Sequence, residues 1–178
     1  MFKVKPLQLV KKVHFPIIEP VPTKQAKKED KLFKRFLRFI TNRRSFKIAK
    51  DYVCWSEYLQ AFIFLPKSFD FDGASVPKLM NNIYLPTGIL FYGACPHDFG
   101  YRYGGFILIN PDTYECYFKQ LSKKEIDSVF NDLCYQESGM KKASGLATFV
   151  LSFAGKIAWR KWRKESRSSF LDFPRVYE

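Results

Sequence analysis

The residue types best suited to acid–base chemistry gather in one short stretch of the sequence. His97 and Asp98 are adjacent, and Tyr101 follows four residues after the histidine. On a helix, residues four apart share a face and adjacent residues point about 100° apart, so one helix would present an imidazole and a carboxylate to neighbouring sides of a cavity. The only other histidine, His14, lies in a lysine-rich segment. If the protein has a general base that titrates near neutrality, His97 is therefore the candidate.

A second predicted helix supplies the carboxylate that such a base needs. Residues 122–125 read Ser-Lys-Lys-Glu, a capping box that predicts a helix over residues 123–137. Asp127 adjoins the apolar face of this helix. Its carboxylate could accept the imidazole N–H, fix the tautomer and stabilise the cation formed on proton abstraction. His97 and Asp127 are therefore the candidate catalytic residues, and Tyr101 lies on the same helix face as the histidine. The alternative is that the histidine and its neighbouring aspartate only brace loops through hydrogen bonds.

Oxygen ligands suited to a hard cation occur in a predicted loop over residues 69–77. The loop contains Asp70, Asp72 and Ser75, and loops rich in oxygen ligands bind calcium or magnesium. Asp98 would bring the number of ligands to a reasonable count, so Asp98 and Asp72 are candidate metal ligands together with Asp70 and Ser75. The alternative is an ordinary turn followed by a helix cap.

The fold predicted to position these residues is α+β. Segments rich in aromatic and β-branched residues predict a hairpin or two short strands over residues 52–65 and a hairpin over residues 106–118. The second hairpin turns at Asn-Pro-Asp-Thr, a favourable turn tetrad. It lies between the helix with the His-Asp pair and the helix with Asp127. Short hairpins and a core of two or three helices therefore follow a basic N-terminal arm and helix.

The predicted helices have recognisable limits. The apolar segment over residues 89–103 suits a helix that starts near Pro96 or is kinked there. Gly139 ends the following helix. A last helix runs from Ala143 to about Lys164 and ends in basic turns. Its apolar stripe consists of Leu146, Phe149, Val150, Phe153 and Ile157.

Charge divides the chain into unlike parts. The net charge is +13, of which residues 1–50 carry +12, residues 51–140 carry −5, residues 141–167 carry +7 and residues 168–178 carry −1. We expect a basic arm with an amphipathic helix at residues 1–50, a single α+β domain at 51–165 and a C-terminal tail at 166–178. Basic ends attract anionic membranes, nucleic acid and acidic proteins.

The basic segments suggest particular partners. An apolar face within residues 31–50, formed by Leu32, Phe33, Phe36, Leu37 and Ile40, predicts an amphipathic helix that could lie on an anionic membrane or pack on the domain. Residues 1–50 and 156–167 could bind nucleic acid, and without aromatic residues interleaved among basic ones that binding would be non-specific.

Several functional classes lack their sequence signals. The four cysteines, Cys54, Cys95, Cys116 and Cys134, include no Cys-x-x-Cys pair, so we expect reduced thiols in the core. There is no P-loop, Gly-x-Gly-x-x-Gly or Gly-x-Ser-x-Gly motif, and we expect no small-molecule cofactor. No signal peptide and no membrane-spanning apolar run is recognisable.

Four motifs occur in the order found in a known family. Residues 65–77 read LPKSFDFDGASVP, residues 94–101 read ACPHDFGY, residues 127–130 read DSVF, and a glycine then precedes the helix to Trp159. Over about residues 50–162 the chain resembles the phage and prophage family called domain of unknown function 1353. The resemblance implies a tailed-phage or prophage origin. It implies no established reaction. Because no signal peptide or membrane-spanning run is recognisable, we expect synthesis in the host cytoplasm, and a later virion or membrane-peripheral location is left open.

A second, local resemblance concerns the order of the chemical residues. His-Asp-x-x-Tyr on a helix, then a hairpin, then a helix with Asp is similar to secretory phospholipase A(2), including the version inside parvovirus capsids. The resemblance implies that His97 activates water, Asp98 binds calcium, Tyr101 supports the network and Asp127 orients the histidine. Calcium would act as the Lewis acid. The glycine-rich calcium loop of that family is missing, so Asp72 would have to replace it.

Three functions follow as hypotheses. The first is a tailed-phage, metal-assisted hydrolase of lipid-like esters at the host envelope, a candidate calcium-dependent esterase bound to anionic membrane. The second is a non-catalytic virion or membrane-docking protein that contacts other virion proteins. The third is a non-specific nucleic-acid-associated phage protein.

Overall fold

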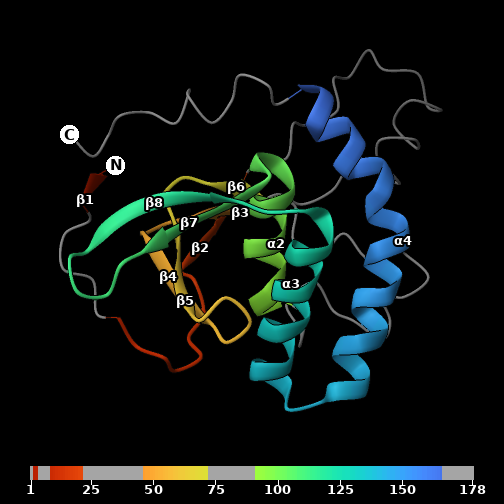
Figure 1. Cartoon of the computed structure of the whole chain (residues 1–178), viewed down its shortest axis with the longest axis horizontal. Helices are drawn as coiled ribbons and strands as arrows, with labels where there is room; N and C mark the ends of the chain where they lie inside the picture. The colour runs from red at the N-terminus through yellow and green to blue at the C-terminus, as the bar shows by residue number, and fades with distance from the viewer. Residues whose placement is uncertain (1, 4–8, 22–45, 72–90, 166–178) are drawn as a thin grey trace, which may run out of the picture.

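The described part of the chain forms two small antiparallel sheets and a set of helices, as predicted for an α+β protein. The computed structural model describes residues 2–3, 9–21, 46–71 and 91–165. Figure 1 shows the sheets on one side of the molecule, α4 at its opposite edge, and α2 and α3 between them.

The larger sheet has the strand order β1-β8-β7-β5-β4. Its central strands are almost completely buried because both are rich in aromatic and branched side chains. Both predicted hairpins are present, with Cys54 opposite Ile63 in one and Ile107 opposite Phe118 in the other. The strands are β1 (Phe2–Lys3), β4 (Tyr52–Ser56), β5 (Ala61–Leu65), β7 (Gly105–Ile109) and β8 (Glu115–Gln120).

The turn of the second hairpin forms as its sequence predicts. Oδ1 of Asn110 accepts hydrogen bonds from the backbone N–H groups of Asp112 and Thr113, at 2.9 and 3.2 Å. Such a side-chain-closed turn is typical of Asn before Pro. Tyr114 then adopts a positive φ of 56° before β8 begins.

The smaller sheet joins the N-terminal segment to the domain. It has the order β2-β3-β6, formed by β2 (Ile18–Pro20), β3 (Phe46–Ile48) and β6 (Asp70–Phe71). Residues 46–48 are therefore a strand, in which Phe46 pairs with Phe71 in an antiparallel register. The apolar positions of the expected amphipathic helix, Leu32 to Ile40, lie outside the described residues.

Helix α2 (Phe91–Tyr103) carries the His-Asp pair and contains Pro96. A start near Pro96 is wrong, because the helix begins five residues earlier. Proline removes one hydrogen bond of the helix, to the carbonyl of Tyr92. Tyr92, Ala94 and Cys95 are buried in the core, and this burial holds the first turn in place without that bond. Gly104, with φ of 77°, follows the helix.

Helix α3 (Lys123–Ser138) has the predicted limits to within one residue. The Ser122 hydroxyl accepts from the Glu125 N–H, and Glu125 Oε2 accepts from the Ser122 N–H at 2.7 Å. Gly139 takes the left-handed conformation and closes the helix. The predicted apolar face is confirmed, since all five of its residues are buried: Ile126, Val129, Phe130, Leu133 and Cys134.

Helix α4 (Lys141–Glu165) begins two residues earlier than predicted. Two members of the expected apolar stripe are not packed in the described part of the chain, because Leu146 and Phe149 are 52% and 61% exposed. Ser144 and Gly155 are buried instead, since small residues allow α4 to approach its neighbours closely. The side chains of Val150, Phe153 and Ile157 lie outside the described part. No described helix is long and apolar enough to cross a membrane.

Candidate functional site

Two glycines allow the helices that carry the candidate residues to pack closely. A Cβ atom on Gly93 would lie 2.7 Å from Sγ of Cys134, and one on Gly100 would lie 2.8 Å from Cγ2 of Ile126. Both contacts are too short for a side chain, so only glycine fits at either position. Because α2 and α3 run antiparallel at this short separation, the side chains between these contacts meet directly.

His97 lies between two carboxylates in this interface. Its Nε2 is 3.4 Å from Oδ1 of Asp127, and its Nδ1 is 3.9 Å from Oδ1 of Asp98. The side chains of His97 and Asp127 are each only 7% exposed. The first distance is at the outer limit of a hydrogen bond, and the second is too long for a direct one.

Asp127 is the centre of a hydrogen-bond network that joins three helices. Its Oδ1 accepts from the Tyr101 hydroxyl at 2.7 Å. Its Oδ2 accepts from Nζ of Lys123 at 2.6 Å and from the Ser152 hydroxyl at 2.8 Å. Burial alone would raise the pKa of this carboxyl, but the hydrogen bonds from His97, Lys123, Tyr101 and Ser152 outweigh it and hold the pKa well below its usual range. Asp127 is therefore a carboxylate that accepts hydrogen bonds only.

The same carboxylates set the protonation of His97. Burial lowers the pKa of the imidazole, but the contact with Asp127 and the negative charges of Asp127 and Asp98 exceed that effect, so the pKa lies above its ordinary value of 6.5. Because Asp127 only accepts, Nε2 carries the proton of the neutral ring. The lone pair is then on Nδ1, which faces Asp98.

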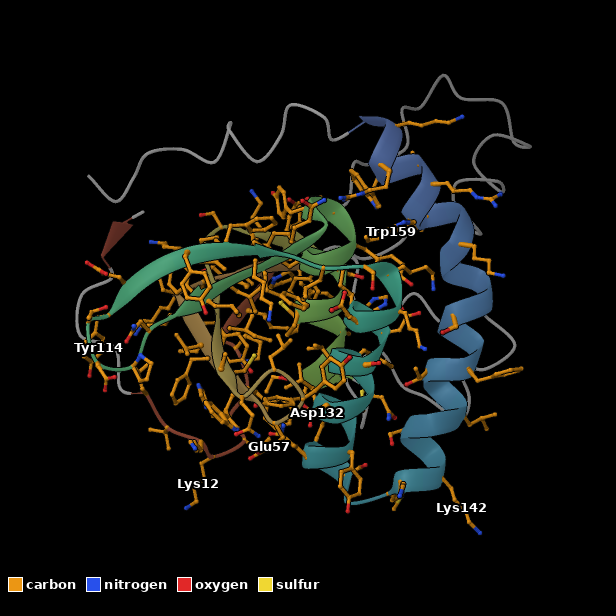
Figure 2. All side chains as sticks on the ribbon, viewed as in Figure 1. Lys12, Glu57, Tyr114, Asp132, Lys142 and Trp159 are labelled. Carbon is orange, nitrogen blue, oxygen red and sulfur yellow. The ribbon has the colours of Figure 1, made fainter. Side chains whose placement is uncertain are left out.

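Tyr101 is fixed from the side of α4. A Cβ atom on Gly155 would lie 2.5 Å from the Tyr101 hydroxyl oxygen, so the glycine makes room for the phenol. The Trp159 ring packs edge-on against Tyr101, with centroids 5.5 Å apart. Figure 2 shows Trp159 on the side of α4 that faces α2. Burial raises the pKa of Tyr101, so its hydroxyl stays protonated and donates to Asp127.

The predicted catalytic residues meet, whereas the predicted metal ligands are only partly placed. His97, Asp127 and Tyr101 are in contact, and Asp98 lies at the other ring nitrogen of the histidine. Asp72 is outside the described residues. Among the residues that the structure describes, no three His, Cys, Asp or Glu side chains are grouped so as to hold a metal ion.

Other carboxylates near these helices have separate partners. Asp70 pairs with Arg102 at 2.8 Å. Asp132 accepts from the Ser56 hydroxyl at 2.8 Å and from the Tyr58 N–H at 3.0 Å, and Figure 2 shows it beside the turn between β4 and β5. Both aspartates brace strands against helices, away from the imidazole.

Sequence reasoning missed two members of the network, Lys123 and Ser152. Lys123 precedes Asp127 by four residues on one helix, a spacing that pairs opposite charges, so its contact was readable from the sequence. Ser152 arrives from α4, 25 residues further along the chain. No local pattern predicts that contact, because it depends on how α4 packs.

The four cysteines are free and buried, as predicted. Burial raises the pKa of Cys95 and Cys134 well above the ordinary thiol value. These thiols are packing groups of the core, and the Sγ of Cys134 contributes to the close contact at Gly93.

Comparison with known proteins identifies the family. The family described as "Protein of unknown function (DUF1353)" matches residues 46–151. The match spans β3 to the middle of α4 and includes every residue of the His97–Asp127 network except Ser152. No curated protein and no solved structure matches the chain. The chain therefore belongs to the DUF1353 family, whose function is unknown.

Proposed function

We propose that the chain is a tailed-phage hydrolase of lipid-like esters in which His97 is the general base. The supporting observation is the arrangement of its ring: Nε2 lies 3.4 Å from Asp127 and Nδ1 faces Asp98. The Tyr101 hydroxyl donates a 2.7 Å hydrogen bond to Oδ1 of Asp127, the same oxygen that faces His97. A buried carboxylate that orients an imidazole, with the second nitrogen left as a proton acceptor, is the arrangement required to activate water.

The proposed reaction needs only groups of the chain and one water molecule. Nδ1 of neutral His97 removes a proton from water as the water oxygen attacks the ester carbonyl carbon. The resulting imidazolium is stabilised by Asp127, which accepts from Nε2. His97 then donates the proton to the departing alkoxide, so that ester and water yield a carboxylic acid and an alcohol.

Asp98 is proposed to position that water. The Nδ1–Oδ1 separation of 3.9 Å is too long for a direct hydrogen bond. A water molecule that donates to both the imidazole and the carboxylate suits such a distance. This role does not depend on a metal ion.

Whether the proposed hydrolysis depends on calcium is a question for experiment. Asp98 offers one carboxylate, but the described residues contain no cluster of three metal-binding side chains. Asp72, the other expected ligand, lies outside them. The described side chains therefore do not form a calcium site by themselves, and none of the proposed reaction steps involves a calcium ion.

A non-catalytic role has its own supporting observation. Asp127 joins α2, α3 and α4 through Tyr101, Lys123 and Ser152. In a virion or membrane-docking protein the same network would only hold three helices together, with His97 as one more donor. This alternative predicts a stable fold with no turnover.

Fatty-acid release from liposomes separates the two functions. The wild type is compared with His97→Gln in calcium and in chelator, and unfolding is measured for both chains. Release by the wild type that is lost in a folded His97→Gln variant supports the hydrolase. No release from any ester, with a destabilised variant, supports the structural role instead.

A further inference from the structure

The outer side of α4 carries a stripe of exposed side chains. Leu146 and Phe149 are 52% and 61% exposed, and Lys142, Arg160 and Lys164 are exposed on the same helix. Their spacing places all five on one side of the helix, because residues three, four and seven apart share a face. We call these five residues the α4 stripe. Figure 1 shows that α4 forms an edge of the described molecule, and in Figure 2 Lys142 points away from the other helices.

The inward side of α4 has a different composition. Ser152 donates to Asp127, Gly155 contacts Tyr101 and Trp159 packs on the same tyrosine. These contacts fix which side of the helix faces the domain. The exposure of Leu146 and Phe149 therefore follows from the docking of α4 and does not arise from fraying of its end.

The charge of α4 is of one sign. Residues 141–164 contain seven Lys and Arg and no Asp or Glu. Within the α4 stripe the two large apolar residues lie in the N-terminal half and Arg160 and Lys164 in the C-terminal half. A helix side with large apolar residues, several cations and no anion complements the surface of an anionic bilayer, which offers both phosphates and acyl chains.

We propose that the α4 stripe docks the protein on an anionic lipid surface. Leu146 and Phe149 enter the boundary between headgroups and acyl chains, while Lys142, Arg160 and Lys164 contact lipid phosphates. Nucleic acid fits less well, since its backbone rewards cations but gives no binding free energy to an exposed leucine and phenylalanine. The inference stands apart from the proposed hydrolysis, because it concerns exposed residues of α4 that take no part in the His97–Asp127 network.

The first test places a fluorescent probe on and off the stripe. Leu146→Cys and Ala158→Cys are each labelled with an environment-sensitive fluorophore. Ala158 is an exposed residue of α4 outside the stripe, and the native thiols are buried, so the label reaches the introduced cysteine. On vesicles of equal parts phosphatidylcholine and phosphatidylglycerol, the probe at position 146 should shift to the blue and that at 158 should not. Equal responses, or none, would overturn the proposal.

The second test measures vesicle affinity with a matched charge change. Leu146→Glu and Ala158→Glu each alter the net charge by the same amount, so their difference reports the stripe and not the overall charge. We expect Leu146→Glu to weaken binding to the same vesicles by about tenfold more than Ala158→Glu does, the effect of losing one buried leucine side chain. Equal effects of the two variants on vesicle binding would contradict the proposal. A larger effect of Leu146→Glu than of Ala158→Glu that is found for duplex DNA but not for vesicles would contradict it as well.

Vesicle binding must also be independent of catalysis. His97→Gln should bind the vesicles as the wild type does, whether or not either chain releases fatty acid. If Leu146→Glu weakens vesicle binding more than Ala158→Glu does and no chain releases fatty acid, the docking surface is supported and only the proposed hydrolase function is rejected.

Discussion

The Tyr101 hydroxyl donates a 2.7 Å hydrogen bond to Oδ1 of Asp127, the oxygen that also faces Nε2 of His97. Tyrosine and histidine come from one helix and the aspartate from its neighbour. Gly93 and Gly100 permit the close approach of these helices. The geometry of the candidate site therefore depends on helix packing as much as on its polar residues.

Asp127→Asn should destabilise the protein strongly. The substitution leaves Nζ of Lys123 without its 2.6 Å carboxylate partner in a largely buried place. Breaking such a pair costs about 3–5 kcal/mol in the free energy of unfolding. Urea denaturation checks this value, with Asp112→Asn on the exposed hairpin turn as the control of equal charge change. If both variants unfold at the same urea concentration, the network does not stabilise the fold.

Two glycines of α4 should respond in opposite ways to alanine. Gly155→Ala forces a Cβ against the Tyr101 hydroxyl and should cost about 1–3 kcal/mol, as overpacking does. Gly145 has no atom within 4 Å of its Cβ position, so Gly145→Ala should stabilise the helix by about 0.5–1 kcal/mol. Thermal unfolding of both variants tests the packing of α4 on Tyr101. Stabilisation by Gly155→Ala would show that α4 does not pack there.

The free energy of unfolding should depend on the protonation of His97. Because Asp127 and Asp98 raise its folded pKa above 6.5, the folded state binds more protons than the unfolded state between those two pKa values. This contribution to stability is fully present below pH 6.5 and is lost as the pH rises through the folded pKa.

Histidine resonances measured by NMR can check that prediction, since the chain has only two histidines. His97 should titrate above 6.5, and His97→Gln should remove the corresponding loss of stability, whereas His14→Gln should not. A His97 resonance that titrates below 6.5 would contradict the account.

Glu137 should destabilise the protein as it ionises. Burial raises its pKa to about 7, although the carboxylate accepts a hydrogen bond from the Tyr92 N–H at the start of α2. Its contribution to stability is therefore lost as the pH rises through about 7. Glu137→Gln keeps an oxygen acceptor and should make stability less dependent on pH in that range. Glu19→Gln, on an exposed strand, is the control, and an equal change in both variants would argue against the prediction.

Local patterns were sufficient for much of the fold and for the centre of the site. The capping box and Gly139 set the limits of α3 because caps are formed by neighbours in sequence. The meeting of His97 with Asp127 followed from the faces of two helices and from the motifs of the family. The caps and the helix faces depend on residues close together in the chain, and the order of the family motifs indicated that the two helices meet.

Features that depend on packing between distant segments were not predictable. Burial of Tyr92 and Cys95 extends α2 ahead of Pro96, against the local preference of proline. The contacts of Ser152 and Gly155 with the site arise only because α4 docks through small residues. The same docking leaves Leu146 and Phe149 exposed, although their spacing alone resembled a buried stripe.

The most direct test of the proposed function is the pH dependence of fatty-acid release from phosphatidylglycerol-containing liposomes. The wild type should release fatty acid at a rate that rises with pH as His97 loses its proton, with a midpoint above 6.5. His14→Gln should behave as the wild type, and a folded His97→Gln variant should lose at least about a hundredfold in rate, the usual contribution of a general base. Release that is unchanged in His97→Gln, or no release at any pH with or without calcium, would contradict the proposal.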